Sequence, residues 1–138
     1  MAFPNYPDAA MVSTNPTSFL QVTDATTVDL NVTNGITTLF SNPTASGRVF
    51  YVTDIIIYDP STSLTTASIS IGQNSTSWND ILANATHTGL DGATKYKVLV
   101  PVAAASVEVA AGGNVKIKVN TAQGAAATAK FRLVGFFV

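Results

Sequence analysis

Few residues in this sequence are of the types that carry out catalysis. The chain contains one histidine, His87, and no cysteine. A histidine base needs a nucleophile and an orienting partner within reach, and no Gly-x-Ser-x-Gly motif distinguishes one of the many serines as a nucleophile. We therefore interpret His87 as a solvated loop residue, and we predict that the protein is not an enzyme.

The carboxylates show no spacing typical of a catalytic pair or a metal site. Asp54 and Asp59 are five positions apart, which places them on opposite faces of a straight strand, so they do not converge on one glycosidic bond. Asp80 and Asp91 could share a calcium ion, but the Asp-x-Asp-x-Asn-Gly order of a dedicated loop is missing. A zinc site of the usual histidine and cysteine type is excluded by composition. We expect neither a metal nor a cofactor.

Trp78 is the single tryptophan and lies in a stretch with several asparagines. An exposed tryptophan with polar neighbours can stack on a sugar ring, so Trp78 and His87, within the expected loop 73–91, are the candidate contacts of a glycan site. The simpler interpretation is that Trp78 closes one end of the domain with Ile81 and Leu82. The sequence leaves both interpretations open.

Composition limits the partners of this chain. Its 138 residues suffice for one domain with its own core. Only 11% of the residues are charged, the net charge is −1 and the seven basic residues are scattered, so no cluster could neutralise a row of phosphates. No apolar run approaches the length of a membrane helix. We expect neither nucleic acid nor a membrane as partner, whereas a surface so poor in charge is prone to associate with other proteins.

Short runs rich in β-branched residues, separated by turn signals, predict an all-β domain over residues 18–138. About eight to nine short strands favour a single β-sandwich of the jelly-roll type. An immunoglobulin-like sandwich stays open, because spacing along the chain does not determine strand order. The expected strands are 19–23, 28–32, 36–41, 48–58, 67–72, 95–100, 107–109, 115–119 and 130–138.

Several local features carry further expectations. The run 48–58 is nearly continuous in apolar residues and is expected at the centre of a sheet, whereas 67–72 alternates and is expected to be half-buried. Ser77, with Asp80 three positions later, predicts a short helix over 77–83 inside a long connection between the sheets. Gly112 and Gly113 predict a hairpin turn.

The first 17 residues are expected to form an extended arm outside the domain. Three prolines make them unsuitable for a helix and poor partners in a sheet. Aromatic residues in such a segment suggest anchors that bind a neighbouring chain. The residues expected to make this contact are Phe3, Pro4, Tyr6, Pro7 and Met11.

The last expected strand is apolar on both faces. Lys130 and Arg132 flank Phe131, but no charged side chain follows Leu133. A strand of this kind must be covered on both faces. We expect the side chains that follow Leu133 to belong to the core or to an oligomer contact, with Val134 and Phe136 facing one way and Phe137 the other. The full set is Val134, Phe136, Phe137 and Val138.

The whole chain resembles the small structural proteins of tailed bacteriophages, in particular capsid cement (decoration) proteins. The shared features are the arm, the sandwich dense in Ala, Thr, Ser and Gly, segments such as 52–57 and 133–138, and the absence of cysteine. The resemblance implies a homotrimer on the outer surface of the virion head, whose arms hold subunits of the major capsid protein. Tail-tip and fibre head domains share this sandwich, so a receptor-binding domain that recognises a cell-surface glycan is the alternative.

Overall fold

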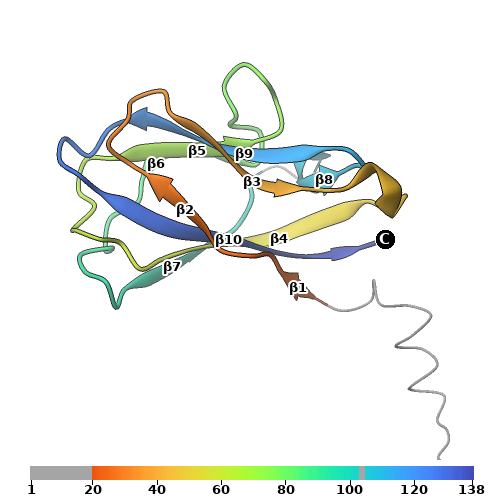
Figure 1. The fold of residues 1–138 in the computed structure, drawn as a ribbon, viewed down its shortest axis with the longest axis horizontal. Helices are drawn as coiled ribbons and strands as arrows, with labels where there is room; N and C mark the ends of the chain where they lie inside the picture. The colour runs from red at the N-terminus through yellow and green to blue at the C-terminus, as the bar shows by residue number, and fades with distance from the viewer. Residues whose placement is uncertain (1–19, 103–104) are drawn as a thin grey trace, which may run out of the picture.

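The computed structural model of the protein describes residues 20–102 and 105–138. These residues form two antiparallel sheets that face each other (Figure 1), which confirms the predicted all-β sandwich. The nine expected strands are all present, and a tenth was not predicted. Two short 3-10 helices, η2 (Thr44–Ser46) and η3 (Ala105–Val107), lie in the connections. In the described part of the chain no helix has the length and apolar character needed to cross a membrane.

Sheet A contains six strands and sheet B contains four. The strands of sheet A are β1 (Gln21–Val22), β2 (Thr26–Asp29), β4 (Phe50–Tyr58), β7 (Tyr96–Leu99), β8 (Glu108–Val109) and β10 (Thr128–Phe137). The strands of sheet B are β3 (Ile36–Ser41), β5 (Ser68–Gly72), β6 (Leu82–Thr86) and β9 (Asn114–Thr121).

Strand pairing identifies the sandwich as a jelly roll. Strand β2 pairs with β10, β3 with β9, β4 with β7, and β5 with β6. The eight main strands therefore pair first with last, second with seventh, and so on inwards. The β10–β4 and β9–β5 ladders then join these pairs into two sheets. In an immunoglobulin-like sandwich the first two strands share a sheet, whereas here β2 and β3 lie in different sheets, so that alternative is excluded.

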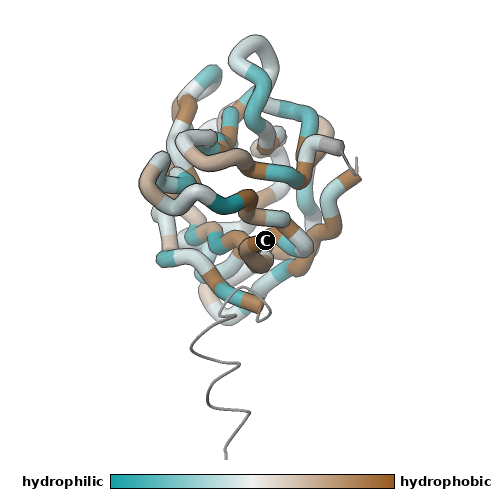
Figure 2. The backbone as a smooth tube through the Cα atoms, turned by 90° about the vertical axis from the view of Figure 1, so that its right-hand side faces the viewer, coloured by the Kyte–Doolittle hydropathy of each residue, from teal (hydrophilic) through white to brown (hydrophobic). Residues whose placement is uncertain are grey.

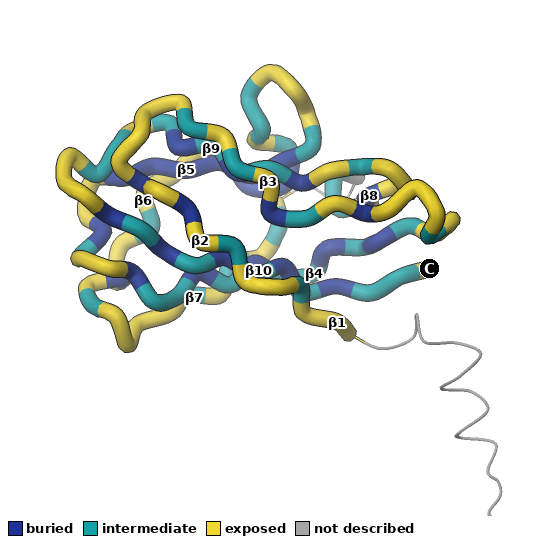
Figure 3. Tube along the Cα trace, in the orientation of Figure 1, coloured by how far each residue is buried: buried dark blue, intermediate teal, exposed yellow. Residues whose placement is uncertain are grey.

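The core lies between the two sheets (Figure 3) and is built by strict alternation of side chains. Residues of β9 and β10 alternate between buried and partly exposed along most of each strand. Strand β4 lies centrally in sheet A, with β10 on one side and β7 and β8 on the other, as predicted. A bulge leaves Thr53 without an opposite residue, and its Oγ1 donates to the Val134 carbonyl at 3.1 Å. Because of this extra residue, Val52 and Ile55 both face the core.

The predicted helix over 77–83 is wrong. Asp80 does not act at a helix N-terminus; its carboxylate accepts two backbone N–H groups of the preceding turn, at 2.7 and 3.2 Å. Trp78 has a positive φ of 50°, which is incompatible with a right-handed α-helix at this residue. The Ile81 N–H donates to the Ile71 carbonyl at 3.0 Å, and Leu82 begins the unpredicted strand β6. The connection that crosses from sheet B to sheet A comes after β6.

Strand β5 is buried on both faces, which corrects the expectation of a half-buried strand. The loop 73–80, which rises from the outer side of sheet B in Figure 1, supplies part of the cover. The Ser70 hydroxyl donates to the Ser77 carbonyl of this loop at 3.1 Å and accepts from the Asn120 amide at 2.9 Å. The alternating serines of β5 therefore mark a face covered by the protein itself.

The turn at Gly112 and Gly113 links the two sheets and does not form the predicted hairpin. Strand β8 before it pairs with β4 in sheet A, and β9 after it pairs with β3 and β5 in sheet B. The buried Asn42 holds this crossing in place. Its backbone exchanges hydrogen bonds with both glycines, at 2.7 and 2.9 Å, and its amide nitrogen donates to the carbonyls of Arg48 and Val109, both at 2.8 Å.

Replacing Asn42 with Ala is expected to lower the free energy of unfolding by about 2–4 kcal/mol, because two carbonyls lose their donor inside the protein. Urea denaturation followed by circular dichroism measures this change. The control is Asn84→Ala on the exposed strand β6, for which we expect a change below about 0.5 kcal/mol. Equal stability of the two variants would contradict this account of the crossing.

Candidate functional site

Three of the acidic side chains in the described chain make structural contacts. Asp59 forms an ion pair with Lys130 at 2.7 Å, Asp80 caps the 73–80 loop, and Asp91 lies 3.9 Å from Lys95. Among the described residues no group of three or more His, Cys, Asp or Glu side chains could hold a metal ion. That the protein is not an enzyme stays a prediction.

The predicted arm lies outside the described residues. Phe3, Pro4, Tyr6, Pro7 and Met11 all precede Leu20, where the described chain begins. Their role as anchors therefore stays a prediction. The described chain begins with Leu20, which leads directly into β1, next to the C-terminal end of β10.

The terminal strand β10 is covered on both edges by neighbouring strands and on its inner face by the core. Its outer and inner aromatic side chains have different surroundings. Phe136 stacks on Tyr51 at a centroid distance of 5.4 Å on the outer face of sheet A, whereas Phe137 lies 5.0 Å from the Phe50 ring. Val134 faces outward beside Phe136, and Val138 is 65% exposed, although its backbone pairs with Val49. A role of these side chains in an oligomer stays a prediction.

Gly135 explains how an apolar strand can pass the largest side chain of the core. A Cβ atom at this position would overlap the Tyr51 carbonyl oxygen and would lie 2.7 Å from the Phe50 ring. No side chain fits there, so the Phe50 ring occupies the place that a β10 side chain would otherwise fill. The glycine inside the apolar run is therefore a packing requirement.

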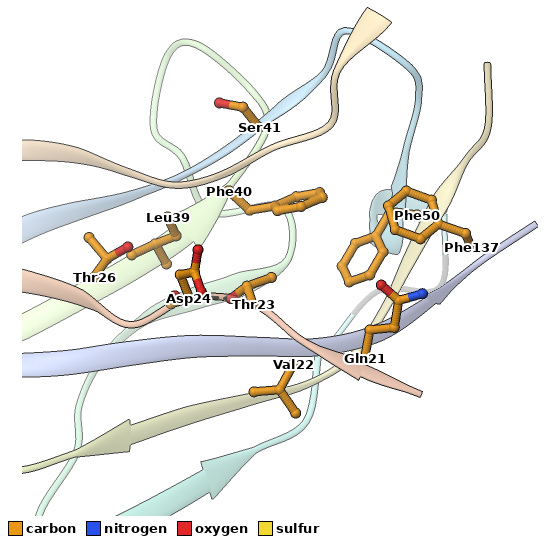
Figure 4. A pocket seen from close by; sticks show the side chains of 10 residues that line it. All are labelled: Gln21, Val22, Thr23, Asp24, Thr26, Leu39, Phe40, Ser41, Phe50 and Phe137. Carbon is orange, nitrogen blue, oxygen red and sulfur yellow. Dashed lines mark hydrogen bonds between the residues drawn. The ribbon is translucent and has the colours of Figure 1, made fainter. Parts of the chain in front are cut away.

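A hollow lies between β1 and β3 (Figure 4). It has a volume of about 420 Å³. Its floor is an aromatic cluster, because Phe50 contacts both Phe40, at 4.6 Å, and Phe137. The polar side chains around it are those of Gln21, Thr23, Asp24, Thr26 and Ser41. We call this hollow the aromatic pocket.

The aromatic pocket lies at the end of the sandwich where both the C-terminus and the start of the described chain are found (Figures 1 and 2). Gln21 lines it, and a neighbouring hollow of about 330 Å³ extends from Gln21 and Phe137 towards Arg48. An apolar floor with a polar rim suits a hydrophobic or aromatic side chain of a protein segment. The described lining of the pocket includes one carboxylate, that of Asp24, and neither a histidine nor a cysteine.

The structure separates the two residues of the candidate glycan site. Trp78 precedes β6 and His87 follows it, and the residues around Trp78 differ from those around His87. Trp78 is half-buried over the outer side of sheet B, where the Lys116 ammonium lies 4.9 Å from its ring centroid. One face of the indole is thus already in contact with a cation.

His87 is half-buried, which corrects its interpretation as a solvated loop residue. Its ring lies against apolar side chains at the other end of the core, including Leu30, Leu90 and Phe131. Its Nε2 atom is buried and has no hydrogen-bond partner. Burial, with a smaller contribution from the nearby Lys97 ammonium, lowers the pKa of His87 below its ordinary value of 6.5.

Residues that define the aromatic pocket were missed by reasoning from sequence, because Phe40, Phe50 and Phe137 are far apart along the chain. Each lies near the end of a predicted strand. Only the pairing of β3, β4 and β10 within their sheets brings these ends together. The terminal apolar run was the available signal, and it indicated Phe137 alone.

The described residues thus define a jelly-roll domain with an aromatic pocket beside its N-terminal strand. No protein-family model and no curated protein matches the chain. Solved structures with this fold include a chain from the acidic stable capsid of Helicobacter pylori bacteriophage KHP30, with a TM-score of 0.53 and 16% identity over 87% of this chain and 97% of that one. A chain from the capsid asymmetric unit of cyanophage Pam1 aligns with a TM-score of 0.51 and 14% identity, over 86% and 83%. The protein shares its fold with chains of two phage capsids.

The lowered pKa of His87 predicts a pH-dependent stability. In the unfolded chain His87 takes up a proton near pH 6.5, whereas in the folded protein it does so only at a lower pH. The free energy of unfolding is therefore highest above pH 6.5, and it falls as the pH drops from that value towards the folded-state pKa. Thermal denaturation at a series of pH values between about 5 and 7.5 follows this loss, since carboxylates titrate mainly below that range.

The variant His87→Leu removes the only histidine of the chain. Its melting temperature is expected to be nearly constant over the same pH interval. The same decline in the wild type and the variant would show that another group is responsible.

Proposed function

We propose that this protein is a capsid cement (decoration) protein of a tailed bacteriophage. It binds the outer surface of the head as a homotrimer and stabilises the lattice of the major capsid protein. The observation that carries the proposal is the jelly-roll fold, which aligns over most of its length with chains from two phage capsids. A chain with few charges, and with no catalytic or metal-binding group among its described residues, agrees with a structural role.

The arm is the part of this protein that attaches to the shell in the proposed function. Phe3 and Tyr6 are its aromatic anchors, with Pro4, Pro7 and Met11 between and after them. Burial of two aromatic side chains contributes on the order of 4–6 kcal/mol, which is enough to affect attachment when many copies act on one lattice. The domain then acts as the body that links neighbouring arms, and neither a cofactor, a nucleic acid nor a membrane takes part.

Deletion of residues 1–17 tests this division of roles. The truncated protein is expected to keep its melting temperature within a few degrees, because β1 and the core remain, but to lose binding to capsids that lack the protein. Co-sedimentation with such capsids measures binding. The double variant Phe3→Ala with Tyr6→Ala serves as the conservative version and is expected to bind at least about tenfold more weakly. Undiminished binding by the truncated chain would refute the role of the arm.

The alternative, a receptor-binding domain at the tail tip or fibre, differs in copy number. A cement protein is expected in hundreds of copies per particle, because it follows the capsid lattice, whereas a tail-tip protein is present in few copies. Quantitative mass spectrometry of purified virions distinguishes the two. We also expect Trp78→Ala to leave adsorption to cells unchanged, since Trp78 and His87 do not share a site. A low copy number with weakened adsorption would favour the glycan-binding alternative.

A further inference from the structure

The outer face of sheet A is unusually apolar and aromatic for a surface. Pairing of the strands arranges its outward side chains in rows across the sheet. Val98 lies beside Ile56, Tyr96 lies beside Tyr58, and Val22 lies beside Val134. Tyr96 is 70% exposed, Val98 50% and Val22 53%. The Phe136–Tyr51 stack extends the same face towards the C-terminus.

The charged groups on this face carry both signs: Lys130 and Arg132 of β10 are positive, whereas Asp54 and Glu108, which pair in register with Val134 and Tyr51, are negative. Lys130 forms an ion pair with Asp59, and this hydrogen bond raises the pKa of Lys130. The Arg132 guanidinium donates to the Tyr58 hydroxyl and to the Thr23 carbonyl, both at 3.0 Å, and lies 5.9 Å from the Tyr58 ring centroid. A face without excess charge of one sign does not repel a second copy of itself.

The outer face of sheet B has the opposite character. Lys116, Lys118 and Asn120 point outward from β9, and the loop 73–80 covers part of β5. Ile36, on the edge strand β3, is 50% exposed there. Two lysines on one strand would oppose contact with the same face of another copy. The two sheets therefore differ in what they can bind.

The outer face of sheet A is not flat. A hollow of about 380 Å³ lies at one end of β7, lined by Tyr58, Tyr96, Arg132 and the segment 93–95. Val100, just beyond the other end of β7, is 69% exposed. A hollow and a protruding apolar side chain at different places on one chain fit a head-to-tail contact, the kind that closes into a ring of copies.

The size of the face is near the lower limit for a stable contact between subunits. The six strands of sheet A comprise 31 residues, which at about 3.3 Å per residue and about 4.8 Å between strands cover roughly 500 Å². Stable interfaces bury about 800 Å² on each partner. The face is smaller than this standard size and approaches the lower limit of about 600 Å² on each partner, before the relief of its side chains is counted.

We infer that the outer face of sheet A is the surface through which copies of this chain bind one another, with Val98, Ile56 and Tyr96 among its contact residues. This inference rests on the homotrimer of the proposed function and assigns the surface that forms it. The arms and the outer face of sheet B then remain available for the capsid.

A matched pair of variants of the full-length protein tests the assignment. Val98 and Ile36 are each 50% exposed and lie on the edge strands of sheets A and B. Val98→Asp places an unpaired carboxylate in the proposed contact and is expected to shift dissociation to at least about a hundredfold higher protein concentration. Ile36→Asp is expected to leave assembly unchanged. Sedimentation velocity over a range of concentrations measures assembly, and circular dichroism verifies that both variants are folded.

Each other outcome overturns part of the proposal in a distinguishable way. A wild-type protein that stays monomeric at all concentrations would overturn both the surface and the homotrimer. Assembly that survives Val98→Asp, or that is lost only with Ile36→Asp, would overturn the surface and leave the homotrimer standing. If Val98→Asp abolishes co-sedimentation with capsids without changing the assembly state, the face contacts the shell and not another copy. Should Val98→Asp fail to fold, Val98→Thr, which is nearly isosteric, is measured in its place and must weaken assembly.

Discussion

The ladder between β10 and β4 is the interaction on which the rest of the structure depends. It joins the β2–β10 pair to the β4–β7 pair, and so makes sheet A continuous. Its inner side supplies much of the core through Phe131, Leu133, Ile55 and Ile57. Its outer side carries the apolar rows of the face. One ladder therefore supports both the stability of the domain and the surface that it presents.

Two local irregularities make this ladder possible. The extra residue at Thr53 changes the parity of β4, so that side chains on both sides of the bulge reach the core. Gly135 then leaves room for the Phe50 ring, which supports Phe40 and Phe137 around the aromatic pocket. The pocket next to the predicted arm thus exists because β10 lacks a side chain at one position.

The strands could be predicted from sequence because alternation in β9 and β10 reflects a local requirement, one face in the core and one outside. The helix over 77–83 was mispredicted because the spacing of Ser77 and Asp80 does not determine which backbone N–H groups the Asp80 carboxylate binds. In the structure it accepts hydrogen bonds from the N–H groups of the preceding turn. Strand β5 was misjudged because its polar face is covered by a loop rather than by water. Both errors arise from contacts made by the 73–80 loop, which a short window of sequence does not contain.

The candidate surfaces depend on strand register and so were predictable only in part. The terminal apolar run indicated that Val134 to Val138 needed cover, but which side each residue faces relative to β4 and β7 follows from pairing between residues 38 to 87 positions apart. His87 gave no sequence signal of burial, because the apolar residues around it come from several distant segments.

The pairing of the first main strand with the last, and of the second with the seventh, also affects how the domain folds during synthesis. The strand that completes sheet A, β10, is synthesised after the other described strands, and it pairs with β1 and β2 at the other end of the described chain. Until residues 128–137 have been synthesised, β4 lacks one of its neighbours and the core stays open. Contacts over such long sequence separations form slowly, so the nascent chain exposes apolar strands for much of its synthesis. The low-charge sequence therefore has to stay soluble through a long unfolded period before its strands can close.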